Sequence, residues 1–378
     1  MLFEIDHSVA ELFSTGAHTS ADTEAVAMLA LSAAEGKHRI AGPRSVLRVL
    51  AGLTTLRSRE RAAFQRALAQ TAEAGQLARH LQTVGCVVAQ AAARPVMSAT
   101  SGRTTITFPL TWFNETARIQ PAVLLCENPI DVRIMRLIGE SGPLELLGYL
   151  PLSHDPSNGG GSTIGLVLEH QALAGRLCLC IVDSDKCYPG GSLGSTAATV
   201  QRFKGSEFPT VEVRETGGRE LENALPDIFY FEQYSSDARY RPMTALLHHL
   251  TEANEIEARN HLDVKEGVLL FDISEAADQD SREYWNAKRS LLEAGASASF
   301  DSLPCSGMQT CARASRRNCT CVLVPGIRAR VLEDYASFAE GKDVYAIKRE
   351  LDESVRAEWH RLGLMVASWC CGDRPLRA

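Results

Sequence analysis

The sequence predicts an α/β protein whose parallel sheet is flanked by mainly helical N-terminal and C-terminal regions. Two continuous apolar runs of strand length, 121–126 and 176–182, are typical of strands that are buried on both faces of a parallel sheet. Helical patterns follow the first run, over 132–138, and precede the second, over 164–174. This alternation predicts right-handed crossovers within one mostly parallel layer.

The 378 residues correspond to two or three domains of ordinary size. We expect a mainly helical N-terminal domain over 1–118, an α/β domain over 119–228 and a mainly helical region over 229–378. In the first domain, apolar residues at helical spacing predict helices between 21 and 80, before a short β-rich run over 104–110. Further expected elements are a strand near 144–150, a flexible Gly-rich loop over 155–162, and helices over 245–260, 274–294 and 344–364.

Composition and charge exclude several classes of protein. The chain is 45% hydrophobic and 22% charged, which is the balance of a soluble globular protein, and no apolar stretch approaches the length of a membrane span. The first residues lack the basic start of a secretory signal, and eleven cysteines, an odd number, argue against a disulfide framework. We therefore expect a cytoplasmic protein. A net charge of −7 excludes nucleic-acid binding by bulk positive charge but not a local basic face.

Carboxylates follow both predicted buried strands. Glu127 comes directly after the first strand, and Asp183 and Asp185 come directly after the later one. In an α/β sheet, the carboxyl ends of the strands are where functional residues gather. Mg²⁺ is held by few carboxylates, several waters and substrate phosphate oxygens, and carboxylates held together without a cation are costly. A helix-capping role is the alternative for each acid, but three acids at strand ends favour a metal site.

These residues resemble the TOPRIM domain that topoisomerases, bacterial primases and OLD-family nucleases share. The matching features are the apolar strand that ends in Glu127 and the strand that ends in Asp183-Ser-Asp185-Lys186. Glu222, which Asn223 follows, also resembles a Glu-Asn signature of OLD-like and related stand-alone TOPRIM proteins. The resemblance covers about 122–226, and it departs from many TOPRIM domains in having Asn128-Pro129 where Gly follows the first Glu.

The resemblance implies a Rossmann-like TOPRIM fold and a nuclease that depends on Mg²⁺ or Mn²⁺. The implied catalytic residues are Glu127, Asp183, Asp185 and Lys186, where Lys186 would neutralise charge on a phosphoryl transition state. The implied metal ligands are Glu127, Asp131, Asp183, Asp185 and Glu222, with Asp131 and Glu222 as candidates for a second metal.

The resemblance also implies a biological setting. Such nucleases often act in bacterial defence against phage with an ATPase, and this chain has no Walker motif, so an ATPase would be a separate partner subunit. DNA is the favoured substrate over RNA, and self-association into a homo-oligomer is left open. The alternative is a non-catalytic nucleic-acid-binding or regulatory module in which the carboxylates are structural.

Two further clusters carry hypotheses of their own. Between Glu35 and Arg66 lie eight basic residues against two acidic ones, and Arg44/Arg48 and Arg57/Arg61 each share a helical face because they are four residues apart. We interpret these four arginines as a nucleic-acid contact, with a solvated helical face as the alternative. Four thiols within seventeen residues are a candidate Zn²⁺ site, although their spacing is irregular and free cysteines are the alternative: Cys305, Cys311, Cys319 and Cys321.

Overall fold

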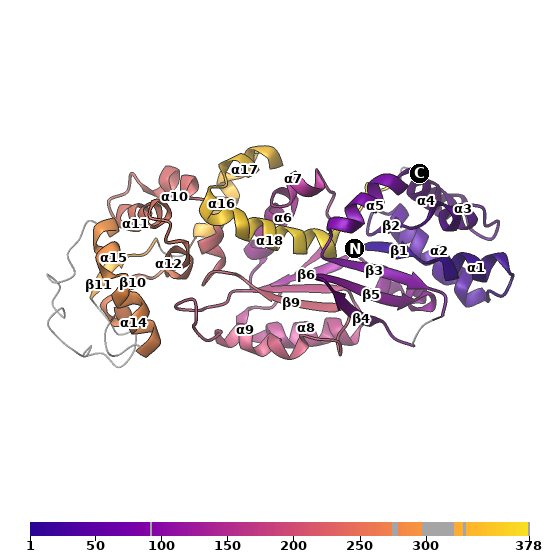
Figure 1. The fold of residues 1–378 in the computed structure, drawn as a ribbon, viewed down its shortest axis with the longest axis horizontal. Coiled ribbons are helices and arrows are strands. Elements are labelled where there is room, and N and C mark those ends of the chain that lie inside the picture. Colours follow the sequence, from indigo (N-terminus) through magenta and orange to yellow (C-terminus); the bar gives the residue numbers. More distant parts are fainter. Residues whose placement is uncertain (91–92, 274–278, 297–320, 328–329, 377–378) are drawn as a thin grey trace. The chain divides into compact units, whose positions relative to one another are not determined.

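The computed structural model describes residues 1–90, 93–273, 279–296, 321–327 and 330–376, which form two compact units (Figure 1). The first unit comprises Met1–Val182, Thr199–Arg214 and Trp359–Ala378. The second unit comprises Asp183–Ala198 and Glu215–Glu358. These boundaries do not coincide with the three consecutive segments that we expected, because the chain leaves the first unit and returns to it twice.

The first unit begins with a five-stranded sheet, where the sequence predicts mainly helices. Its strand order is β2-β1-β3-β5-β4, with β4 antiparallel to β5 and the other neighbours parallel. The expected β-rich run over 104–110 is confirmed as part of β5. The strands are β1 (Leu2–Ile5), β2 (Arg39–Ala41), β3 (Thr83–Val88), β4 (Val96–Thr100) and β5 (Arg103–Pro109).

Five helices accompany this sheet, and they confirm the helical pattern predicted between 21 and 80. Thr19 starts the second helix with a capping box, in which its Oγ1 accepts a hydrogen bond from the backbone N–H of Asp22. The helices are α1 (His7–Ser14), α2 (Ser20–Ala34), α3 (Arg44–Ala51), α4 (Ser58–Ala69) and α5 (Thr71–His80). Two short 3₁₀ helices follow β5, η1 (Leu110–Asn114) and η2 (Thr116–Ile119).

The predicted parallel sheet is present as a four-stranded layer with the order β7-β6-β8-β9. The central strands β6 (Ala122–Cys126) and β8 (Cys178–Val182) are buried along their whole length, as their apolar sequences predicted. β6 is parallel to β8 and to β7 (His154–Asn158), while β9 (Val211–Glu215) is the other edge strand. Helix α8 (Ile164–Leu173) lies on one face, and α6 (Pro129–Ser141) lies on the other (Figure 1).

Two expectations for the segment between β6 and β8 were wrong. Residues 144–150 form no strand but contain the short helix α7 (Leu144–Leu147), which ends at Gly148 with a φ of 64°. Part of the expected flexible loop instead forms β7, an edge strand that can accommodate Pro156 because one side of an edge strand needs no ladder hydrogen bond. Two short 3₁₀ helices lie nearby in the sequence. η3 (Gly161–Thr163) directly precedes α8, and η4 (Gln201–Phe203) lies between β8 and β9.

The C-terminal helix α18 (Glu353–Cys370) contributes its last two thirds, from Trp359 on, to the first unit. Trp359 and Trp369 are fully buried there. The backbone N–H of Gln82, which precedes β3, donates to Ser368 Oγ at 2.9 Å, and the N–H of Ser153, which precedes β7, donates to Cys370 O at 2.7 Å. The helix therefore joins residues from both sheets of this unit.

The second unit is mainly helical, as expected for the region after 229. Three of the predicted helices are each divided in two, at Ala253–Glu255, at Lys288 and at Leu351–Asp352. Its elements are η5 (Leu221–Ala224), α9 (Ser195–Val200, shared with the first unit), α10 (Asp227–Tyr234), α11 (Arg241–Glu252), α12 (Ile256–His261), β10 (Gly267–Leu269), α13 (Leu270–Ile273), α14 (Gln279–Ala287), α15 (Arg289–Ala296), β11 (Val322–Pro325), α16 (Val331–Phe338) and α17 (Val344–Glu350).

Most of the candidate zinc site cannot be located in the structure. Cys305, Cys311 and Cys319 of the candidate zinc site lie outside the described residues, whereas Cys321 is buried. None of the helices in the described part of the chain has the length and apolarity needed to span a membrane.

A fully buried arginine holds the helical part of the second unit together. Arg259 in α12 is 0% exposed, and its guanidinium donates to Asp227 Oδ1 at 2.6 Å through Nη2. The same group donates to the backbone carbonyls of Asn223, at 2.8 Å, and Leu225, at 2.9 Å. This one side chain thus supplies hydrogen-bond donors to two backbone carbonyls just after Glu222.

We expect Arg259→Ala to destabilise the protein by about 3–5 kcal/mol, because the change leaves a largely buried carboxylate and two carbonyls without their donor. Urea denaturation followed by tryptophan fluorescence measures the effect as a lower midpoint. Arg239→Ala is the control, because Arg239 is exposed and should leave the midpoint unchanged. Equal midpoints for the two variants would contradict the structural role of Arg259.

Candidate functional site

The two strands that precede the predicted site residues are neighbours in the sheet. β6 and β8 pair in parallel with Leu125 opposite Cys180, so both strands end at the same edge of the layer. Glu127 directly follows β6, and Asp183 is the residue directly after β8. The expected order of strands around these carboxylates is therefore present.

The turn after β6 is shaped by capping and by the Gly-rich loop. The N–H of Asn128 donates to Asp131 Oδ2 at 2.8 Å in a capping box, and Pro129 occupies the first turn of α6. The N–H of Gly160, whose φ is 60°, donates to the carbonyl of Glu127 at 3.1 Å. Asp131 therefore has the capping role that was the alternative for these acids, and its role as a metal ligand stays a prediction.

The segment after β8 is fixed by hydrogen bonds within the second unit. Asp183 Oδ1 accepts from the backbone N–H of Leu221 at 2.8 Å. Ser184 is buried, and its Oγ donates to the carbonyl of Gly218 at 2.6 Å and accepts from the N–H of Lys186 at 3.2 Å. These contacts connect the Asp-x-Asp segment to the loop that leads into the Glu-Asn element.

Asp185 adopts an unusual backbone conformation, and its side chain lies against a glycine. Its φ is 54°, in the left-handed region, and its N–H donates to the carbonyl of Arg219 at 2.8 Å. A Cβ at Gly194 would lie 2.1 Å from Asp185 Oδ2, which is closer than atoms can approach. Gly194 therefore leaves the space that the Asp185 carboxylate occupies.

The Glu-Asn element holds two carboxylates beside one lysine. Lys265 Nζ lies 3.3 Å from Glu220 Oε1 and 3.2 Å from Glu222 Oε1. The side chains of Glu220 and Glu222 are only 13% and 5% exposed, and the second oxygen of each accepts no hydrogen bond. Asn223 orients the element, because its side chain accepts from the N–H of Glu220 and donates to the carbonyls of two residues near the end of α12, Arg259 and Leu262.

Burial and like charge shift the protonation of this cluster. Burial first, and then the charge of Glu222, raise the pKa of Glu220 to about 7. Burial alone would lower the pKa of Lys265, but the carboxylates of Glu222, Glu220 and Asp183 together raise it above its usual value. Partial burial raises the pKa of Asp185, although the positive charges of Arg219 and Lys265 oppose the shift.

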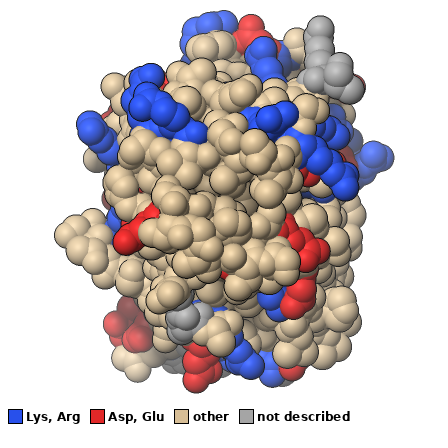
Figure 2. All heavy atoms as spheres, turned by 90° about the vertical axis from the view of Figure 1, so that its right-hand side faces the viewer, with Lys and Arg blue, Asp and Glu red and all other residues tan. Residues whose placement is uncertain are grey.

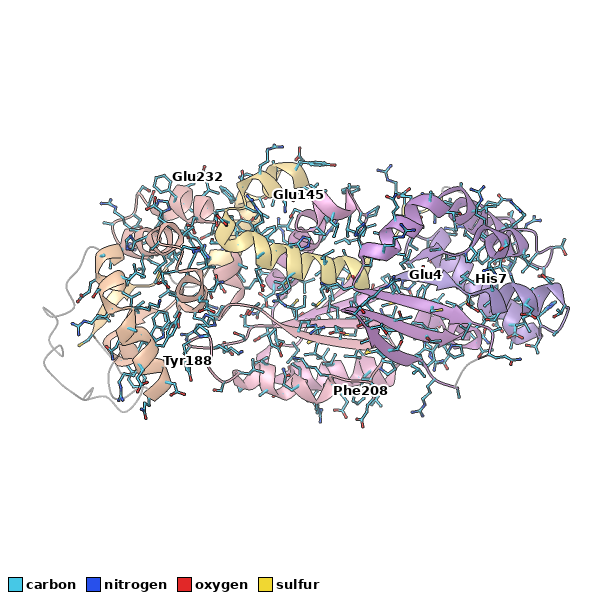
Figure 3. All side chains as sticks on the ribbon, viewed as in Figure 1. Glu4, His7, Glu145, Tyr188, Phe208 and Glu232 are labelled. Atoms are coloured by element: carbon cyan, nitrogen blue, oxygen red, sulfur yellow. The ribbon has the colours of Figure 1, made fainter. Side chains whose placement is uncertain are left out.

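A second ion pair lies beside the first. Arg219 Nη2 contacts Asp263 Oδ2 at 2.8 Å, and Asp263 is buried. The loop after Lys186 leads to Tyr188, which is labelled in Figure 3 and whose ring lies 6.2 Å from that of Tyr284 in α14. The part of the second unit that contains Asp183 and Asp185 thus holds two cations and three carboxylates. The cations are Lys265 and Arg219, and the carboxylates are those of Glu220, Glu222 and Asp263.

This cluster has the oxygen ligands that suit a hard cation but no complete metal shell. In the part of the chain that the structure describes, no group of three or more His, Cys, Asp or Glu residues is arranged to hold a metal ion. The unpartnered oxygens of Glu220 and Glu222 are the acceptors that a cation could use, and Lys265 stands beside both residues.

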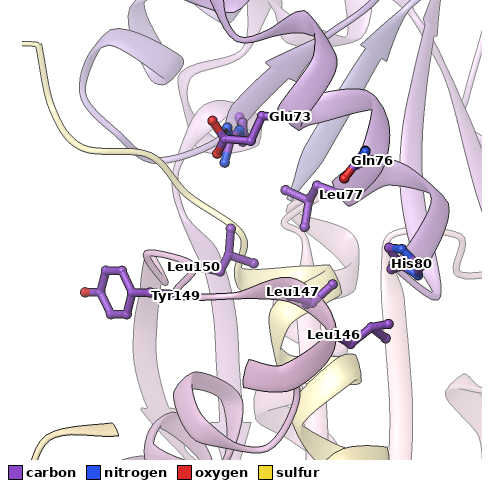
Figure 4. Close-up of a pocket in the computed structure, with 9 residues that line it drawn as sticks. Glu73, Gln76, Leu77, His80, Leu146, Leu147, Tyr149 and Leu150 are labelled. Atoms are coloured by element: carbon purple, nitrogen blue, oxygen red, sulfur yellow. Dashed lines mark hydrogen bonds and ion pairs between the residues drawn. The ribbon is translucent and has the colours of Figure 1, made fainter. Parts of the chain in front are cut away.

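A separate pocket lies in the first unit, between α5 and the segment around α7 (Figure 4). Its volume is about 120 Å³, and leucines from both segments line it together with Tyr149 and His80. Arg39 also lines it but is already paired with Glu73 at 2.7 Å. None of the predicted site residues lines this pocket, so the pocket is separate from the candidate site.

Sequence reasoning missed the residues that neutralise and shape the site. Lys265 and Arg219 supply its positive charge, and Gly194 makes room for Asp185. Arg219 directly precedes Glu220 and could have been singled out with the Glu-Asn element, but no motif marks Lys265. Gly194 stands in a Gly-rich stretch, 189–194, that resembles an ordinary loop.

We compared the chain with protein-family models, with curated proteins and with solved structures, and none of the three comparisons gave a match. The case for a function therefore rests on strand order, on the placement of the carboxylates and on the electrostatics described above.

We expect Gly194→Ala to cost about 1–3 kcal/mol of stability, because the new methyl group overlaps the Asp185 side chain. Asp185→Gly removes the overlapping atoms and also suits the positive φ, so the cost of Gly194→Ala should shrink in that background. Gly75→Ala in α5 is the control, since no atom lies near its new methyl group. A double-mutant cycle by urea denaturation measures the coupling, and additive costs would contradict the proposed contact.

The raised pKa of Glu220 predicts a pH dependence of stability. Between about pH 4.5 and 7 the folded state keeps a proton that the unfolded chain releases, so the free energy of unfolding should fall as the pH rises through this range. Glu220→Gln removes the titration and should therefore gain stability relative to wild type as the pH rises from 5 to about 7.5. Glu232→Gln, at an exposed position, should track wild type. Parallel profiles for wild type and Glu220→Gln would refute this assignment.

Proposed function

We propose that this protein is a Mg²⁺-dependent phosphodiesterase of the TOPRIM type that hydrolyses nucleic acid. The observation that carries the proposal is the parallel pairing of β6 with β8, because it leads Glu127 and the Asp183–Asp185 segment out of the same edge of one sheet. In open α/β sheets this carboxyl edge is where ligands bind. Mn²⁺ is the alternative cation, because it prefers the same oxygen ligands.

The residues present suit such a cation in chemical type. Every candidate ligand is a carboxylate: Glu127, Asp131, Asp183, Asp185 and Glu222. Two buried carboxylate oxygens, on Glu220 and Glu222, lack a hydrogen-bond donor, which is costly unless a cation is close. Because Mg²⁺ keeps several waters and binds substrate phosphate, an incomplete protein shell is compatible with its binding.

The chemistry that we propose divides between the cation and the side chains. When bound, Mg²⁺ supplies charge for the phosphoryl oxygens and acidifies a coordinated water. Glu127 holds the cation or accepts a proton from the attacking water, and Lys186 neutralises charge that develops on the phosphoryl group. Lys265 partly offsets the repulsion between Glu220 and Glu222 in the absence of a bound cation.

The biological setting belongs to the same proposal. We propose a cytoplasmic enzyme of bacterial anti-phage defence that acts with a separate ATPase subunit, with DNA favoured over RNA as substrate. The alternative is a non-catalytic nucleic-acid-binding or regulatory module. The ion pairs of Lys265 with Glu220 and Glu222 favour this alternative, because they already give these carboxylates a structural role. Zn²⁺ bound by Cys305, Cys311, Cys319 and Cys321 stays a prediction.

We expect Asp183→Asn to lower plasmid nicking in Mg²⁺ or Mn²⁺ by about 100-fold or more, because the amide cannot act as an anionic ligand. The amide oxygen can still accept the hydrogen bond from Leu221, so the fold should persist. Asp237→Asn is the matched control, since this partly exposed aspartate pairs with the exposed Arg239 two residues away.

Two results would separate the alternatives. Wild-type nicking that needs a divalent cation and is lost in Asp183→Asn supports the enzyme. Absence of nicking by wild type, or equal nicking by both proteins, would instead favour the non-catalytic module.

A further inference from the structure

The hairpin of α3 and α4 presents a concentrated positive surface in the first unit. We call it the arginine face and define it by five side chains, which are exposed except for the half-buried Arg61: Arg44, Arg48, Arg57, Arg59 and Arg61. Figure 2 shows lysine and arginine atoms gathered across the upper part of this end of the first unit, where α3 and α4 lie in Figure 1.

The positive charge of the arginine face is not neutralised within the described residues. No acidic side chain described by the structure forms an ion pair with any of its five arginines, whereas the neighbouring Arg39 and Arg66 pair with Glu73 and Asp373. The one acid inside the hairpin, Glu60, is buried, and it accepts the backbone N–H of Arg57 at 2.7 Å as a cap of α4. The hairpin therefore carries a local excess of positive charge in a chain whose net charge is −7.

Buried apolar side chains of α3 and α4 hold the arginine face in place. Val46, Leu47 and Leu50 bury the opposite side of α3, and Phe64 does the same for α4. Arg44 and Arg48 are about one turn of α3 apart, about 6 Å along its axis. Along a duplex this distance corresponds to roughly two nucleotides of one strand, so Arg44 and Arg48 can reach phosphates of the same backbone. Arg57 and Arg61 do not share a helical face as expected, because Arg57 is the extended N-cap residue of α4 and only Arg61 lies in the helix.

We propose that the arginine face binds the phosphate backbone of duplex nucleic acid without reading its bases. The planar guanidinium group of arginine can donate two parallel hydrogen bonds to phosphate oxygens, which accounts for contact with the nucleic-acid backbone. Residues 44–61 contain no aromatic side chain, and binding to single strands typically relies on aromatic rings on which unpaired bases stack. This inference rests on the proposed function and deepens it by assigning the substrate as double-stranded.

The test measures binding in EDTA, so that it does not depend on cleavage. Fluorescence anisotropy is recorded with a labelled DNA duplex of about 20 base pairs, with the matching single strand, and over a series of salt concentrations. The variant carries Arg44→Gln, Arg48→Gln, Arg57→Gln and Arg61→Gln. A matched control removes four exposed arginines elsewhere, on α5, α6, α11 and α17: Arg79, Arg133, Arg241 and Arg349.

We expect wild type and control to bind duplex more tightly than single strand. The quadruple variant should bind about 100-fold more weakly at low salt, with a salt slope that is flatter by about three to four, since each lost phosphate contact removes roughly 0.9. Replacing the same four arginines with lysine should retain most of the salt slope, which guards against a general loss of fold.

Three results would overturn the proposal. These are unchanged duplex affinity and slope in the quadruple variant, an equal loss in the control variant, and tighter binding to single strand or to anionic phosphatidylserine vesicles than to duplex. Failure of the proposed function is distinguishable, because a protein that binds duplex through this face but never nicks DNA keeps the binding result.

Discussion

The structure of the first unit depends on the burial of the last two thirds of α18. One apolar cluster contains Leu2 of β1, Ala41 of β2, Val84 of β3 and Leu150 near α7, and α18 completes it with Ala367, while Cys371 follows directly after the helix. Each large apolar side chain that leaves water contributes about 1.5–3 kcal/mol, so the tryptophans and aliphatic residues of this helix supply a large share of the core. The five-stranded sheet therefore rests on a helix that lies more than 200 residues away in the sequence.

The electrostatics of the second unit follow from a different constraint, the burial of like charges. Glu220 and Glu222 are too close to ionise independently at low solvent exposure, and Lys265 is the group that makes their joint presence tolerable. A cation at the unpartnered second oxygens of these carboxylates would meet the positive charge of that ammonium. If the proposed cation binds here, the lysine would thus both stabilise the cluster without metal and oppose the approach of the cation.

The elements that could be predicted from the sequence are those with a strong local signal. β6 and β8 were predictable because five consecutive apolar residues of strand length are typical of a strand that is covered on both faces, and α6 because Pro129 marks its first turn. The five-stranded sheet was missed because β1 and β2 are only four and three residues long and lie among strong helical patterns. β7 was missed because its sequence, His-Asp-Pro-Ser-Asn, has no apolar alternation. Lys265 could not be found at all, since only tertiary structure brings it to Glu220 and Glu222.

The path of the chain also determines the order in which the protein can be assembled. Residues 215–358 form a continuous block of the second unit, whereas the core of the first unit awaits residues that are synthesised after that block. During translation the second unit can fold while β1 to β9 still lack the helix that completes their core. Its folding then shortens the loop that must close when α18 docks, which lowers the entropic cost of that closure. The first unit therefore exposes unfinished apolar surface until α18 has left the ribosome.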